Sequence, residues 1–163
     1  MFSLYHLISL AALSLAAPAT RSSPQVIPGP GLPSLASLNL TSEYLYSLPK
    51  PVTDPDQLST LTDPYCGPDF AYIPVNDAIA CFHYLDGLGE QFCGVPDTQR
   101  SSVFCTAGRG SRIEGFGIGQ RSWCKHVAQA VLWTIDHCTR PGQDTAGSAP
   151  AYGNGGLVVF TGK

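Results

Sequence analysis

The apolar positions in the C-terminal part of the chain recur with the spacing of an α-helix. Six of them share one helix face, because the last five follow the first at +3, +4, +7, +11 and +14: Cys124, Val127, Ala128, Val131, Ile135 and Cys138. Ser122 precedes them and is a residue type that caps helices, while Pro141 and Gly142 end the pattern. We therefore expect a helix over residues 122–138, lying on a hydrophobic core.

A shorter helix is predicted earlier in the chain. Asn76 or Asp77 is a suitable cap, and Gly87 or Gly89 ends the pattern. The residues that share its apolar face are Ala78, Cys81, Phe82 and Leu85.

Short apolar segments bounded by turn residues predict strands around these helices. They cover residues 70–75, 91–95, 102–106, 108–119 (irregular and glycine-rich) and 157–160, the last following a turn at Asn154 and Gly155. The order is strand, helix, strands, helix, strand. It predicts an α+β fold with two helices packed on a mainly antiparallel sheet, in a sandwich-like split βαβ arrangement.

The first residues differ from this pattern. Residues 1–19 form an apolar run with small-residue cleavage sites after Ala16 or Ala19, which is typical of a signal peptide. The run is short for a membrane span, and no later stretch is apolar enough to be one. We expect a secreted, extracellular protein that does not span a membrane. The alternative is a buried N-terminal helix.

Residues 20–64 are rich in proline and serine and contain no cysteine. Because proline disfavours helix at its own position and at the preceding one, we expect a disordered leader or linker here. The cysteine-rich α+β domain then covers residues 65–163. Asn39, followed by Leu40 and Thr41, forms an N-glycosylation sequon. No dibasic pair marks the leader for removal, so its role as a propeptide stays open.

The cysteines form an even set in a secreted chain, which indicates structural disulfides. They are Cys66, Cys81, Cys93, Cys105, Cys124 and Cys138. The sequence leaves their pairing open. Cys124 and Cys138 lie about 21 Å apart along the predicted helix, so they cannot bond to each other and must join it to other elements.

Catalytic chemistry finds little support in the residues. His126 and His137 are about 16 Å apart on one helix, too far to share a metal. No serine stands in a nucleophile-elbow motif, and disulfides would leave no free thiol. We expect no catalytic residue, metal or cofactor, and therefore no enzyme.

Charge and aromatic residues point instead to a binding surface. The bases of residues 100–125 (Arg100, Arg109, Arg112, Arg121 and Lys125) face only Glu114. They could dock on an anionic surface, or form a solvated face without a partner; aromatic interleaving typical of nucleic-acid binding is missing. On the second helix, Trp133 shares a stripe with His126 and His137, away from the cysteine face. The predicted binding surface is Trp133, His126, His137, Arg109, Arg112, Arg121 and Lys125. The alternative places Trp133 at the core edge or under the leader.

Several short motifs carry a family resemblance: Asn76–Asp77, Phe104–Cys105, Ile118–Gly119, the helix over residues 124–138 and Ala146–Gly147–Ser148–Ala149. The chain resembles the necrosis-inducing extracellular effector family of fungi, related to killer toxins. The resemblance implies a compact α+β sandwich and a non-enzymatic effector or toxin-like protein. Its extracellular target, on a host or competitor cell, is unknown. The alternative function is a small secreted hydrolase, or a hydrolase inhibitor, acting in the cell wall.

Overall fold

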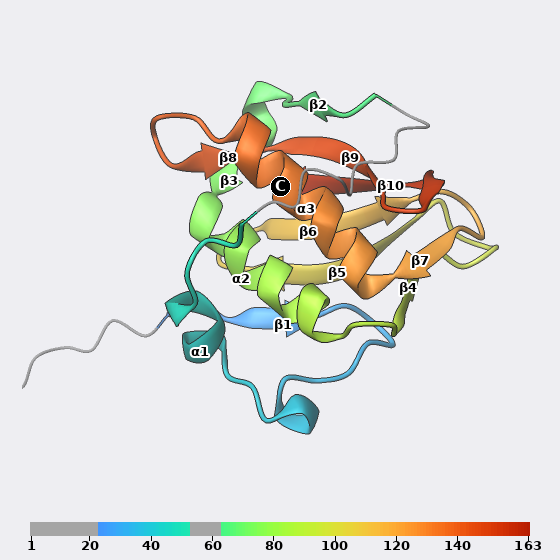
Figure 1. Ribbon diagram of the computed structural model, residues 1–163, viewed down its shortest axis with the longest axis horizontal. Coiled ribbons are helices and arrows are strands. Elements are labelled where there is room, and N and C mark those ends of the chain that lie inside the picture. The colour runs from blue at the N-terminus through green and yellow to red at the C-terminus, as the bar shows by residue number, and fades with distance from the viewer. Residues whose placement is uncertain (1–22, 53–62) are drawn as a thin grey trace, which may run out of the picture.

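A six-stranded sheet forms the base of the fold in the computed structural model, which describes residues 23–52 and 63–163 (Figure 1). Its strands lie in the order β1 (Val26–Pro28), β5 (Ser101–Ala107), β6 (Ser111–Phe116), β10 (Asn154–Gly162), β9 (Gly147–Ala151) and β2 (Tyr65–Cys66). Two small ribbons pair β3 (Ile73–Pro74) with β8 (Asp144–Thr145), and β4 (Phe92–Gly94) with β7 (Arg121–Trp123). All these pairings are antiparallel.

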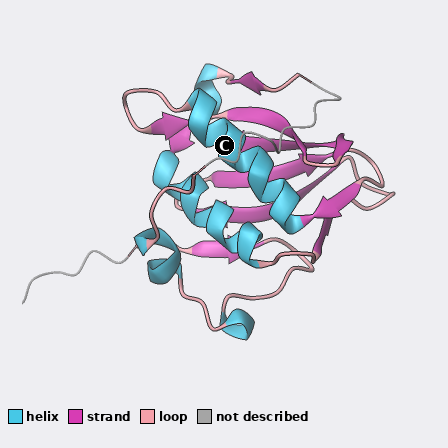
Figure 2. Ribbon diagram, viewed as in Figure 1, coloured by secondary structure: helices cyan, strands magenta, loops and turns pink. Residues whose placement is uncertain are grey.

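Helices α2 (Val75–Gly87) and α3 (Cys124–Cys138) lie side by side over one face of the sheet (Figure 2). Three apolar residues of the predicted α3 face, Val127, Val131 and Ile135, are fully buried. Because β6 and β9 are both antiparallel to β10, they run parallel to each other, and α3 lies in the connection between them. The predicted α+β fold with two helices on a mainly antiparallel sheet is confirmed, including this split βαβ unit.

The start of α3 differs from the prediction. Ser122 does not cap the helix, because carbonyls of a neighbouring loop already bind its first amides. The Cys124 amide donates to the Gln91 carbonyl over 2.8 Å, and the Lys125 amide to the Gly89 carbonyl over 3.1 Å. Ser122 lies in β7 instead.

Three disulfides join Cys66 to Cys138, Cys81 to Cys105 and Cys93 to Cys124. As predicted, the two ends of α3 are bonded to different elements, β2 and β4, while the remaining bridge ties α2 to β5. Each bridge therefore fixes a helix to a strand. Such bridges are typical of proteins that fold in an oxidising compartment.

The leader is not disordered over residues 23–52, which corrects the prediction. β1 pairs with β5 at the edge of the sheet, and α1 (Ser42–Ser47) packs on α2. Neither element conflicts with the prolines of this segment. Helix α1 contains no proline, and Pro28 ends an edge strand, where its missing N–H costs little stability. Thr41 caps α1 by accepting a hydrogen bond from the Tyr44 amide over 3.1 Å. Residues 53–62, like the predicted signal peptide over residues 1–19, lie outside the described residues.

Polar contacts also hold the leader on the domain. Asp77, buried in the first turn of α2, accepts hydrogen bonds from the Tyr46 and Ser111 hydroxyls, each over 2.6 Å. Burial, with Asp77 nearby, raises the pKa of Tyr46. The Tyr84 hydroxyl donates to the Pro33 carbonyl over 2.8 Å, and burial raises the pKa of Tyr84 to about 12. Residues 23–52 of the leader are thus a folded part of the domain.

Candidate functional site

The outer face of the small β4–β7 ribbon carries aromatic side chains. Phe92 lies opposite Trp123, and these side chains are 50% and 36% exposed. Alternate residues of the same strands, Cys93 and Ser122, point inward and are buried. The ribbon therefore presents two large rings to solvent from a backbone fixed on the core side.

Cations lie over both rings. The Arg121 guanidinium is 4.8 Å from the centre of the Phe92 ring, and the Lys125 ammonium is 4.7 Å from that of Trp123. Gly94 stands opposite Arg121, and a Cβ there would come within 2.9 Å of the Arg121 Cβ. Glycine at this position thus leaves room for the arginine to lie across the ribbon.

Two further rings continue the row. The His126 ring centre is 5.1 Å from that of Trp123 and 5.0 Å from that of Tyr152. We call Phe92, Trp123, His126 and Tyr152 the aromatic ridge. Burial and the nearby Lys125 ammonium lower the pKa of His126, which favours the neutral imidazole at neutral pH.

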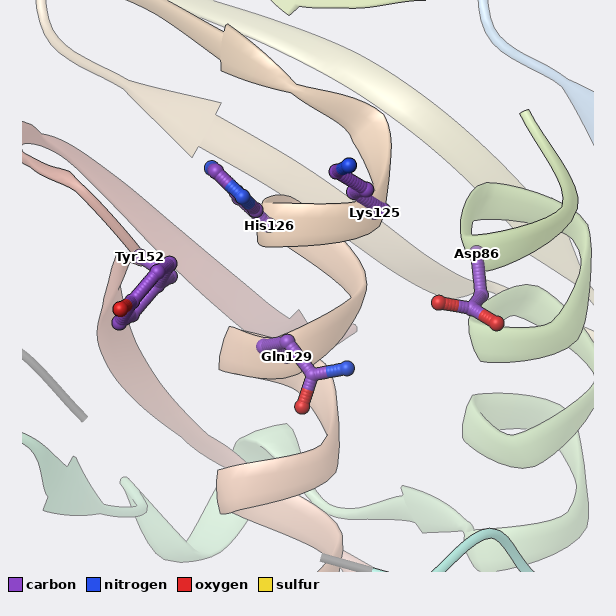
Figure 3. A pocket seen from close by; sticks show the side chains of 5 residues that line it. All are labelled: Asp86, Lys125, His126, Gln129 and Tyr152. Carbon is purple, nitrogen blue, oxygen red and sulfur yellow. The ribbon is translucent and has the colours of Figure 1, made fainter. Parts of the chain in front are cut away.

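Two hollows flank the ridge at His126 and Tyr152. One, of about 280 Å³, is lined by Asp86, Lys125, His126, Gln129 and Tyr152, and we call it the α3 pocket (Figure 3). Figure 3 shows Asp86 on α2 to one side and Tyr152 to the other, with the remaining three side chains on α3 between them. The second hollow, of about 360 Å³, lies along the ridge and reaches Asn154.

The ridge is held firmly. The disulfide between Cys93 and Cys124 ties β4 to the start of α3. The Asn154 side-chain amide donates to the Arg121 carbonyl over 2.8 Å, which fixes the start of β10 on β7. The Ser122 hydroxyl donates over 3.2 Å to the carbonyl of Tyr152. The rings therefore come from three chain segments that are bonded to one another.

Of the predicted binding surface, the structure brings together His126, Arg121 and Lys125. Trp133 lies elsewhere, partly buried against the core and stacked on the His137 ring at 4.5 Å. This position agrees with the alternative interpretation, in which Trp133 lies at the edge of the core.

The other predicted bases also lie apart from the ridge. Arg109 is exposed in the turn between β5 and β6, whereas Arg121 follows the far end of that hairpin. Arg112 pairs with Glu114 over 2.9 Å. Residues 100–125 therefore do not form one basic surface, because the hairpin separates their charges.

Sequence reasoning missed Phe92, Trp123 and Tyr152. A signal was present in β7, where polar or aromatic residues alternate with buried Ser122, as on a half-exposed strand. Nothing in the sequence spacing places Tyr152 beside His126, because β8 and β9 lie between α3 and Tyr152 along the chain.

The arrangement offers contact surface more than reactive groups. The Ser122 hydroxyl is 3.5 Å from His126 Nδ1, but Ser122 is only 7% exposed and its hydroxyl already donates to a carbonyl. Across residues 23–52 and 63–163, no group of three or more His, Cys, Asp or Glu side chains is placed to hold a metal ion. In the same ranges, no helix is both long and apolar enough to cross a membrane.

The predicted glycosylation site lies away from the ridge, in the leader. Asn39 is exposed and adopts a left-handed backbone conformation with φ of 54°. Its side chain is accessible to modification, and glycosylation there stays a prediction.

Comparison with known protein families identifies a match for the cysteine-rich domain. A family described as a domain of unknown function (DUF8794) matches residues 65–162. The matched part includes the whole aromatic ridge and all six cysteines, but not the leader. No curated protein and no solved structure matches the chain.

Proposed function

The chain belongs to the DUF8794 family, whose function is unknown, and we propose that it is a secreted, non-enzymatic effector or toxin-like protein that binds the surface of another cell. The aromatic ridge is the binding site in this proposal. Secretion is supported by the apolar segment over residues 1–19 and by the three disulfides. The effector role follows from the family resemblance of the sequence motifs.

The observation that carries the proposal is the row of exposed rings with cations over two of them. Aromatic and arginine side chains are the residues that most often dominate binding energy at interfaces. Here Phe92 and Trp123 remain partly exposed although the domain has a well-filled core. Rings fixed before binding also lose less conformational entropy when a partner arrives.

The test is binding of the labelled secreted protein to intact plant cells and to yeast cells, representing a host and a competitor. Phe92→Ala and Trp123→Ala should each weaken binding about tenfold or more, equivalent to about 1.4 kcal/mol. Phe70→Ala is the matched control, because Phe70 is 77% exposed but lies in a short 3-10 helix (Asp69–Ala71) near the other end of α3. Equal binding by the ridge variants and the control would overturn the proposal.

The second candidate is a small secreted hydrolase, or a hydrolase inhibitor, acting in the cell wall. In a hydrolase, Ser122 and His126 would be the serine and histidine to test, although Ser122 is largely buried. A screen of glycan and peptide substrates distinguishes the two. Turnover by the wild-type protein that is lost in Ser122→Ala would establish the hydrolase and refute the non-enzymatic role.

A further inference from the structure

We propose that the ligand of the aromatic ridge is a neutral polysaccharide chain. This inference rests on the proposed function and names the chemistry of the target. A pyranose ring presents a face of C–H bonds that packs on an aromatic ring, and an edge of hydroxyls that both donate and accept hydrogen bonds. The ridge and its pockets offer both kinds of contact.

The spacing of the rings suits a chain better than a single small molecule. Phe92 and Trp123 are directly cross-strand, and the next two ring centres follow at 5.1 and 5.0 Å. These two spacings are about the length of one sugar unit. The His126 ring is tilted by 49° to that of Trp123 and stands edge-on, at 86°, to that of Tyr152, so successive units of one extended chain would meet ring faces and ring edges in turn.

Polar groups stand where sugar hydroxyls would reach. In the α3 pocket, Asp86 on α2 offers a carboxylate and Gln129 on α3 an amide (Figure 3). Carboxylate oxygens accept and amide groups both donate and accept, which matches the mixed character of hydroxyls. The pocket volume of about 280 Å³ is at the small end for ligand sites and suits one sugar unit.

The charges of the site argue against an anionic ligand. Lys125 pairs with Glu90 over 3.0 Å, and Asp86 lines the same pocket. The Arg121 guanidinium lies over Phe92, and Asp97 lines a further hollow beside it. Because acidic groups offset the cations, the ridge lacks the strong positive potential that would recruit acidic polysaccharides or phospholipid headgroups.

Depletion of the full-length secreted protein by insoluble polysaccharides tests the inference, with cellulose, chitin and β-1,3-glucan as neutral probes and pectate as the anionic one. We expect binding to at least one neutral probe that persists at about 0.5 M salt, where exposed charge interactions are screened. Trp123→Ala and Gln129→Ala should each reduce it about tenfold. Phe70→Ala should match the wild type.

Failure to bind any neutral probe, binding to pectate alone, or unchanged binding by Trp123→Ala would overturn the inference. Thermal unfolding of each variant verifies that it is folded. If Trp123→Ala does not fold, Phe92→Ala is the second ridge variant. If cells are bound through Trp123 while the neutral probes are not, the carbohydrate inference fails and the proposed function stands. If neither cells nor probes depend on the ridge, both fail.

Discussion

Replacing Leu45 with alanine tests whether the leader is part of the folded domain. Leu45 is 1% exposed in α1, where it packs into the core beside α2. The change removes three carbon atoms, worth about 0.8 kcal/mol each in transfer from water, and leaves a cavity. We expect the free energy of unfolding to fall by about 2.5–4 kcal/mol.

Urea denaturation followed by circular dichroism measures this loss. The matched control is Tyr44→Ala on the same helix, because Tyr44 is 51% exposed and should cost no more than about 0.5 kcal/mol. Hydrogen exchange of the β1 and β5 amides should also accelerate in Leu45→Ala, as the leader opens more often. If Leu45→Ala is as stable as Tyr44→Ala and exchanges at the wild-type rate, the leader contributes nothing to the fold.

Three further predictions concern the ridge and its support. Replacing Cys93 and Cys124 together with serine should lower the free energy of unfolding by about 3–4 kcal/mol, as measured in urea, and weaken cell binding, because β4 is released. Gly94→Ala should displace Arg121 and weaken cell binding, whereas an unchanged affinity would show that the arginine position is unimportant. Folding lowers the pKa of His126, so the free energy of unfolding falls as pH drops from about 6.5 toward that lowered pKa. In thermal unfolding at several pH values, the melting temperature of His126→Asn should therefore fall less over this range than that of the wild type. An equal fall in both proteins would contradict this prediction.

The helices and the fold class were predictable because their signal is local and repeated. Apolar residues recur on one face of α3 over four turns, and this spacing is typical of a helix. The sequence also required that Cys124 and Cys138 bond to separate elements. Their partners could not be predicted, because the pairing depends on which strands meet α3 in the folded chain.

The prediction of a disordered leader was wrong over residues 23–52. The prolines there favour disorder, but capping signals in the same segment favour a helix. Thr41 caps α1, and Leu40 before it, with Leu45 in the first turns, has the spacing of a hydrophobic staple. That signal is visible in the sequence. The ridge is different, since Tyr152 joins His126 only through tertiary structure.

The pairing of β1 with β5 limits the association of this protein with copies of itself. Without the leader, β5 would be a seven-residue edge strand whose unpaired backbone groups could bond to another chain. The strand that covers it is only three residues long and ends in Pro28, which cannot donate a hydrogen bond. The sheet therefore ends at a short, proline-terminated strand in place of the longer β5, and this short edge is less able to pair with another chain. A recombinant chain that begins at residue 65, where the family match starts, is expected to aggregate through β5 even though it retains every disulfide.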